Sequence, residues 1–386
     1  MKTRCLAALV AAGAELRGRG EMFTGINYLP GFNDGYYLSR IRLNVAIEPE
    51  PWLRFFVQGQ DAQAPGYSRK PVPSTVANTF DLRQGYLDLG RPEKVGGGNW
   101  GNAARSFDAA RFIYQRPGVR VDAFSGAVVV PVNGRFDTPH FNNKFHGIYA
   151  SFDKAAPKAT LQPYFLIKTN TRVQDESGKR GDLDVYTMGA RMIGKLPRRF
   201  DYGLETAVQT GHSGGDNIRA WAGHWQAGYT FAARELAPRI IGEYNHASGD
   251  RARGDGKRGT FDQLYPTNHF FYGAADQAGW RNLHDVMGGL EWRPSKKLRV
   301  RTDYHSFWLA ALADSLYNDS GTATVRNPNA TSRHVGQEFD TWAMWRYSDR
   351  LQLGAGLGHL FAGGFLRQSG KASGLSYPYV QWQYIL

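Results

Sequence analysis

Residues 297–308 alternate almost without a break between polar and apolar side chains. Successive side chains of a β-strand point to opposite faces, so Arg299 and Arg301 share one face while Leu298 and Val300 share the other. Such a strand suits a soluble sheet with its charges in water. It equally suits a membrane barrel with lipid outside and water in the lumen. The rest of the chain decides between these two folds.

Similar runs of about ten residues recur along the chain, separated by turn residues. The prolines at 49 and 51 separate two of them, because proline cannot continue a strand ladder and favours a reversal. The predicted strands cover residues 15–23, 37–46, 52–61, 79–90, 105–114, 119–130, 143–153, 158–168, 183–194, 200–210, 217–231, 238–248, 281–293, 297–308, 334–348, 350–361 and 376–386. Segment 91–98 is a candidate for one more strand.

The connections between these strands fall into two length classes. The tight ones are 115–118, 153–158, 195–198, 294–296 and 348–350, and the long ones are 62–78, 169–182, 249–280, 310–332 and 362–375. Alternating short turns and long loops are typical of outer-membrane barrels, whose short turns face the periplasm. The sequence therefore predicts an all-β protein, a single transmembrane antiparallel β-barrel of about 18 strands with long extracellular loops.

The N-terminus has the pattern of a secretory signal. Residues 1–14 combine a basic start, a short apolar run that contains Cys5, and an Ala-Gly-Ala end, which predicts cleavage after Ala14. The barrel domain would then be residues 15–386, without a cysteine and therefore without disulfides or thiolate chemistry. No segment has the 18 or more consecutive apolar residues of a transmembrane helix.

The charge balance predicts the character of the lumen. The chain has 47 basic and 34 acidic residues, a formal net charge of +13. Many charges fall on the polar faces of the predicted strands, where they can pair across neighbouring strands, and the basic surplus would attract anions and repel cations. The predicted pore-lining and substrate-binding residues are Arg17, Arg19, Arg40, Arg42, Arg54, Arg120, Arg191, Arg239, Arg299, Arg301, Arg346, Asp303 and Glu243.

Other function classes have less support in the sequence. A basic chain with interleaved aromatic residues can bind nucleic acid, but the predicted signal and the lipid-type strand faces argue against a nucleic-acid partner. No hydrolase, metalloprotease or phosphate-loop motif is present, and we expect no cofactor and no bound metal. His246, His269 and His284 with nearby aspartates leave open an outer-membrane hydrolase, although loop packing is the simpler interpretation.

The longest predicted loop carries a family resemblance. Its segments 247–250, 259–269 and 279–283, with the strand at 297–308, closely resemble the alginate export family of outer-membrane porins, and the motif at 105–111 adds a further match. The resemblance implies a monomeric barrel of about 18 strands in outer-membrane lipid. It also implies an arginine-rich, anion-selective pore and a periplasmic secretion complex behind it. Residues 90–99 depart from the family, because they are shortened and rich in glycine.

Two channel hypotheses follow for the bacterial outer membrane. The first is passive export of an alginate-like anionic polysaccharide, with Arg40, Arg42, Arg54, Arg299 and Arg301 as the selective wall, and with loops 249–280 and 310–332 folding over or into the mouth. The second is a general diffusion porin for small anions or organic acids. Arginine suits both hypotheses, because its planar fork binds carboxylates through two hydrogen bonds.

Overall fold

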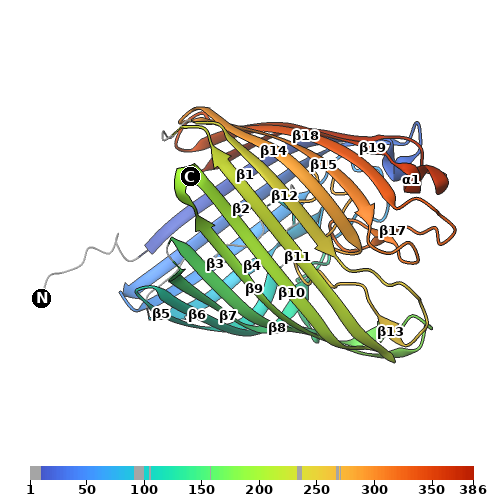
Figure 1. Cartoon of the computed structure of the whole chain (residues 1–386). Coiled ribbons are helices and arrows are strands. Elements are labelled where there is room, and N and C mark those ends of the chain that lie inside the picture. Colours follow the sequence, from blue (N-terminus) through green and yellow to red (C-terminus); the bar gives the residue numbers. More distant parts are fainter. Residues whose placement is uncertain are drawn as a thin grey trace, which may run out of the picture.

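The fold is a β-barrel whose wall is one antiparallel sheet (Figure 1). A computed structural model describes residues 10–90, 100–103, 106–156, 158–232, 237–266, 269 and 271–386. The wall strands are β1 (Val10–Thr24), β2 (Asn33–Glu50), β3 (Leu53–Gln63), β4 (Asn78–Leu89), β5 (Ser106–Arg116), β6 (Val119–Val130), β7 (Thr138–Ala156), β8 (Ala159–Gln174), β9 (Arg180–Lys195), β10 (Phe200–Ser213), β11 (Asp216–Thr230), β12 (Arg239–Ala247), β14 (Leu283–Ser295), β15 (Leu298–Leu309), β18 (His334–Arg346), β19 (Leu351–Ala362) and β20 (Leu375–Ile385).

The remaining elements are small. They are η2 (Ile26–Tyr28), η3 (Pro197–Arg199), β13 (Lys257–Arg258), β16 (Leu316–Tyr317), β17 (Ala323–Val325) and α1 (Gly364–Gln368). β13 joins the wall sheet through a short parallel pairing with β11, and the others lie outside it. In the described part of the chain, no helix is long and apolar enough to cross a membrane. The predicted all-β barrel is confirmed, and the sheet has 18 strands when the two-residue β13 is included.

The barrel closes between its first and last strands. β1 pairs with β20 from Glu15 opposite Ile385 to Thr24 opposite Ser376, and its other edge pairs with β2. Backbone groups inside a bilayer have no water to bind, so every strand edge there needs a partner. This closure explains why the final strand alternates up to residue 385.

One place in the wall differs from simple up-and-down pairing. We call the end of the barrel with the tight turns the short-turn end and the other the long-loop end. β4 and β5 both run toward the short-turn end, because β4 follows the connection 64–77 and β5 precedes the turn at 117–118. Among the described residues these two neighbours share no strand ladder. The predicted extra strand at 91–98 lies outside the described residues.

The two faces of the wall have the two environments that the alternation predicts. On β2 the exposed outward side chains are Ile41, Leu43, Val45 and Ile47, while Arg40 and Arg42 between them point into the lumen and are buried. In a soluble protein the apolar row would be covered. Here about half of the Leu43 side chain remains exposed (50%), which fits contact with lipid.

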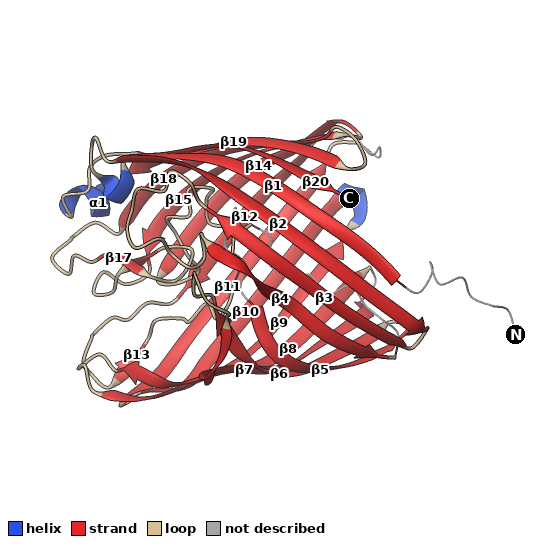
Figure 2. Ribbon diagram, turned by 180° about the vertical axis from the view of Figure 1, so that it is seen from behind, coloured by secondary structure: helices blue, strands red, loops and turns tan. Residues whose placement is uncertain are grey.

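Connection lengths follow the prediction with one exception. Long loops gather at the end that carries α1, β13 and β17, away from the N-terminus (Figures 1 and 2). The predicted long loop 169–182 is wrong, because β8 and β9 continue to Gln174 and Arg180 and leave only residues 175–179 between them. Both strands lose their apolar alternation there because they continue beyond the lipid band.

The structure extends the first strand beyond the predicted domain boundary. Val10 to Ala14 pair with Ile47 to Leu43 of β2. Cleavage after Ala14 stays a prediction, and it would remove the first five residues of β1.

The lipid-facing assignment predicts the outcome of a matched pair of substitutions. Leu43→Arg places a cation against the hydrocarbon layer and should destabilise the barrel by about 2–4 kcal/mol. Asn44→Arg, one position along on the lumen face, should have less than about a quarter of that effect. Denaturant titration of the refolded barrel in lipid vesicles measures both. Equal effects would contradict the assignment of the two faces.

Candidate functional site

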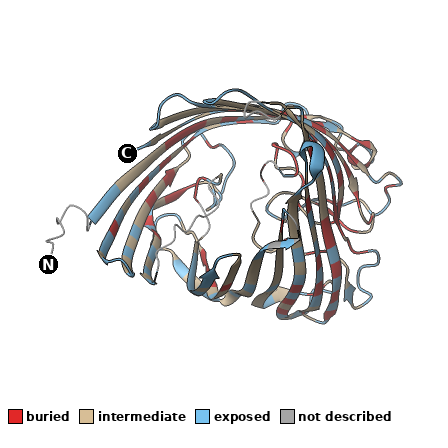
Figure 3. Cartoon of the chain, turned by 60° about the vertical axis from the view of Figure 1, so that its left-hand side comes forward, coloured by how far each residue is buried: buried red, intermediate tan, exposed pale blue. Residues whose placement is uncertain are grey.

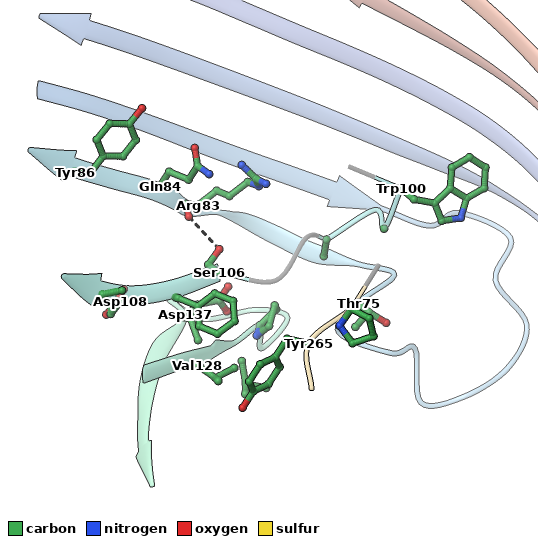
Figure 4. Close-up of a pocket in the computed structure, with 18 of the residues that line it drawn as sticks. Thr75, Arg83, Gln84, Tyr86, Trp100, Ser106, Asp108, Val128, Asp137 and Tyr265 are labelled. Carbon is green, nitrogen blue, oxygen red and sulfur yellow. Dashed lines mark hydrogen bonds between the residues drawn. The ribbon is translucent and has the colours of Figure 1, made fainter. Parts of the chain in front are cut away.

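A large open cavity lies on the β1–β6 side of the lumen and extends between β4 and β5, because the outward-facing Leu82 and Leu87 are among its lining residues. Its volume is about 2650 Å³, and its lining includes Arg19, Arg83, Tyr86, Trp100 and Tyr265. Figure 4 shows side chains of β4 facing this space, with the Ser106 hydroxyl donating to the backbone oxygen of Arg83 at 3.0 Å. Figure 3 shows that chain segments also lie within the ring of strands. These segments determine how much of the lumen stays open.

Residues 100–103, here called the inner segment, lie against β1 and β2 and are held there by arginine side chains. Arg17 donates to the Gly101 oxygen at 3.3 Å and to Asn102 Oδ1 at 3.2 Å. Arg40 also donates to the Gly101 oxygen at 3.2 Å, and Arg19 donates to the Trp100 oxygen at 3.1 Å. Carbonyl groups of irregular backbone need donors, and the guanidinium forks supply several at once.

The Asn102 side chain in turn donates hydrogen bonds from the inner segment to the surrounding backbone. Its Nδ2 donates to the backbone oxygens of Ser39, Gln63 and Val76 at 3.2, 3.0 and 2.9 Å. Its side chain is 2% exposed. One side chain thus connects the inner segment to β2, β3 and the connection before β4.

The arginines of this region are buried by these contacts. Arg17, Arg19, Arg40 and Arg42 are between 1% and 5% exposed. Arg19 Nε lies 2.5 Å from Glu21, Arg40 pairs with Glu15, and Arg42 donates to Gln60 at 2.7 Å. The structure therefore places these four predicted residues on the lumen face, where they hold the wall and the inner segment together.

The described residues between Thr260 and Asn282, here called the inner loop, cross the lumen from one side of the wall, whereas β13 before them pairs with the wall strand β11. Near one side, Asp262 pairs with Lys168 of β8 at 2.8 Å, and its backbone exchanges two 2.7 Å hydrogen bonds with Gln209 of β10. Tyr265 donates to Asn143 of β7. Burial by itself would raise the pKa of Asp262, but Lys168 and Arg281 outweigh it and lower that pKa to about 2.

Toward its other side the inner loop binds acidic residues of β18. The Ala275 amide donates to Glu338 at 2.8 Å and the Ala274 amide to Asp340 at 3.2 Å. Both carboxyl groups are buried, with 0% and 2% exposure. The inner loop is thus attached to β7, β8, β10 and β18, which fixes it across the lumen.

The inner segment and the inner loop meet at stacked rings. The Trp100 and His269 rings are 3.6 Å apart and 10° from parallel, and the Arg19 guanidinium lies 3.8 Å from the Trp100 ring centre. Burial lowers the pKa of His269 and raises that of Asp276, each well away from its usual range, and His269 Nδ1 shares a 2.8 Å hydrogen bond with Asp276 Oδ1. Trp100, His269 and Asp276 all line the open cavity on the side of β1 and β20.

A second set of arginines surrounds the short-turn end, and we call it the mouth ring. Each member lies on the lumen face within five residues of the end of its strand. The mouth ring consists of Arg54 on β3, Arg120 on β6, Arg191 on β9, Arg239 on β12, Arg299 on β15 and Arg346 on β18. Its strands are spread around most of the circumference.

Most arginines of the mouth ring form ion pairs or hydrogen bonds with neighbouring side chains. Arg54 lies 3.3 Å from Glu48 and Arg239 lies 2.9 Å from Asp201. Asp122 accepts hydrogen bonds from both Arg120, at 2.7 Å, and Arg111, at 2.9 Å. Glu291 likewise forms salt bridges with both Arg299, at 3.0 Å, and Arg293, at 3.1 Å. Arg191 donates to the neutral Gln162 at 3.0 Å.

The remaining predicted residues lie between these two regions. Arg301 pairs with Asp303 at 2.7 Å, and Asp303 is 2% exposed. Glu243 accepts from Asn245 at 2.7 Å and lies 3.4 Å from His224. The Arg301–Asp303 pair lies within β15, whereas the contact of Glu243 with His224 joins the neighbouring strands β12 and β11.

The sequence reasoning missed the residues that hold the interior. Asn102, Lys168, Glu338 and Asp340 were outside the predicted set, although the last two lie on a predicted polar face. The alternation of Glu338 and Asp340 on one face of β18 was a signal that could have indicated an attachment point for a long loop. The histidines considered for a hydrolase are separated, because His269 lies in the lumen while His246 and His284 lie on the outer wall.

The fold and the lumen together define a channel protein of the bacterial outer membrane, in which one chain encloses the path. The sequence matches the alginate export family over residues 9–379, so the chain belongs to that family. The family is one of channels and not of enzymes. No curated protein matches the sequence.

Solved structures of Pseudomonas aeruginosa outer-membrane proteins share the fold. OccK8 (OprE) has a TM-score of 0.64 at 12% identity, with 98% of each chain covered. The outer membrane protein opdK has a TM-score of 0.63 at 10% identity, covering 97% of this chain and 98% of its own. OpdK with vanillate has a TM-score of 0.60 at 11% identity, with the same coverage. At these identities the likeness concerns the fold alone.

Removing the Asn102 amide should loosen the inner segment. Asn102→Ala loses hydrogen bonds to three backbone oxygens, at a cost of roughly 1–3 kcal/mol, and should raise the single-channel conductance. Asn329→Ala, at an exposed residue of the loop 310–333, is the control. Unchanged conductance in Asn102→Ala would contradict the anchoring role.

Lys168→Met should release the inner loop from β8, because it leaves the Asp262 carboxylate without its main counter-charge. We expect frequent switching between conductance levels in single-channel records. The lowered pKa of Asp262 means that its stabilising effect is complete above about pH 4 and is lost as the pH falls toward 2. The wild type should therefore keep steady currents from pH 7 to 4. Flicker that begins near pH 6 would contradict this anchor.

Proposed function

We propose that this protein is a passive outer-membrane channel for carboxylate-bearing carbohydrates, with an alginate-like polyuronate as the exported substrate. Membership of the alginate export family supports the substrate class. The mouth ring is the observation that supports anion selectivity. A periplasmic secretion complex that delivers the polymer to the short-turn end is part of this proposal.

At two places around the mouth ring guanidinium groups outnumber carboxylates, because Asp122 and Glu291 each face two of them. Arg54, by contrast, lies near two carboxylates, Glu48 at 3.3 Å and Asp88 at 3.9 Å. Arg191 donates to the neutral Gln162 and lies opposite Glu205 of β10. Cations lining a low-dielectric passage concentrate anions and exclude other cations. Arginine forks also bind carboxylates through paired hydrogen bonds, so a polyuronate could exchange its carboxylates from one arginine to the next.

The path beyond the mouth ring differs from the one the sequence suggested. The inner segment and the wall occupy the hydrogen-bonding groups of Arg17, Arg19, Arg40 and Arg42. These arginines would therefore act on a substrate through their charge more than through direct contact. Substrate would pass through the open cavity, where Tyr86 and Tyr265 offer aromatic surface. Aromatic rings pack against the apolar faces of sugars and of aromatic acids alike.

A diffusion porin for small organic acids is the second candidate. The structure of OpdK with vanillate, an aromatic acid, shares this fold, and the inner loop and inner segment narrow the lumen as a filter for small molecules would. The two candidates differ in whether a polymer enters the channel. They share the mouth ring.

Block of the current by anionic oligosaccharides tests the proposal. Oligomannuronate should interrupt the single-channel current, a neutral oligosaccharide of equal length should not, and Arg54→Gln/Arg120→Gln/Arg239→Gln/Arg299→Gln should weaken the block at least about tenfold. Arg326→Gln, on an exposed loop, is the control. Block by vanillate without block by oligomannuronate would favour the diffusion porin. A single-channel current that neither oligomannuronate nor vanillate blocks would exclude both candidate functions.

A further inference from the structure

Two histidines of the outer wall lie side by side without a role in the lumen. His246 of β12 is directly opposite His284 of β14, and their Nδ1 atoms are 3.3 Å apart. His284 Nδ1 is also 2.8 Å from the Tyr244 hydroxyl. Both histidines share the face of Tyr244 and Val286, which are 39% and 50% exposed to the outside of the barrel, while His246 itself is 8% exposed between the rings of Trp221 and His284.

The same outward face continues over neighbouring strands. His246 packs on the Trp221 ring at 4.2 Å, and His334 lies 5.4 Å from the Trp308 ring and 3.5 Å from the Ser306 hydroxyl. All of these residues lie where their strands approach the long loops. We call this group the outer histidine belt: Trp221, Tyr244, His246, His284, Ser306, Trp308 and His334.

The charges around the outer histidine belt are positive. Arg251 lies in the loop that follows β12, Arg333 directly precedes His334 of β18, and Arg367 lies in α1, which packs against β18. Arg251 and Arg333 are exposed residues of the long loops.

This combination fits an anionic group at a membrane surface. Tryptophan and tyrosine favour the boundary between hydrocarbon and headgroups, and exposed arginines beside them attract lipid phosphates. Imidazole and hydroxyl groups add hydrogen-bond partners at the same depth. An acidic protein would need a surface away from lipid, whereas this belt is continuous with the lipid-facing wall.

We propose that the outer histidine belt with Arg251, Arg333 and Arg367 binds the phosphate groups of lipid A in the outer leaflet. The long loops of outer-membrane barrels are extracellular, so this face meets that leaflet. The phosphates would receive hydrogen bonds from the arginines and the belt side chains, while Trp221 and Trp308 contact the acyl chains. This proposal is independent of what the channel conducts.

Lipid retention by the whole purified barrel tests the proposal. Native mass spectrometry after titration with lipid A, phosphatidylglycerol or phosphatidylcholine should give the tightest binding for lipid A. Arg251→Gln/Arg333→Gln/Arg367→Gln should weaken lipid A binding about 100-fold, on the order of fivefold for each cation removed. Arg293→Gln/Lys296→Gln/Lys297→Gln, at the opposite end of the barrel, should bind lipid A as the wild type does.

Conductance checks that the variants are folded, because the three arginines lie outside the proposed path. If the triple variant does not refold, Arg251→Gln and Arg333→Gln singly should each show a loss of about fivefold. Equal affinity of the wild type for lipid A and phosphatidylglycerol would overturn the choice of lipid. Unchanged binding in the arginine variants would overturn the site.

Discussion

The need to satisfy every backbone polar group within lipid is the constraint on which this structure depends. It requires long paired strands, closure of β1 on β20, and side chains that alternate between lipid and lumen. Closure creates a water-accessible interior lined by one face of each strand. The same constraint makes the relation between β4 and β5 notable, because among the described residues these two neighbours run in the same direction and share no ladder.

The interior uses arginine in two different ways. Near the middle of the wall, Arg17 and Arg40 donate to backbone oxygens of the inner segment, and irregular backbone is thereby stabilised inside a barrel. At the short-turn end, guanidinium groups outnumber the carboxylates they meet at Asp122 and Glu291. The first use fixes the shape of the path, and the second sets the charge at its mouth.

Alternation in the sequence predicted the wall well, because the lipid and lumen environments differ at every second residue. The strand predicted at 119–130 coincides with β6, and that at 297–308 is shifted from β15 by one residue. Alternation could not predict the ends of β8, which extend beyond lipid. Nor could it predict contacts across the lumen, such as Asn102 with Val76, because these depend on which segments fold inward.

The central claim is that the buried arginines shape the lumen while the mouth ring selects anions. The most direct test compares Arg17→Gln/Arg40→Gln with Arg54→Gln/Arg299→Gln in one experiment, measuring conductance and reversal potential in an asymmetric salt bilayer. The account predicts altered conductance with retained anion preference for the first pair, and reduced anion preference for the second. Loss of selectivity in the first pair with no change in the second would contradict it.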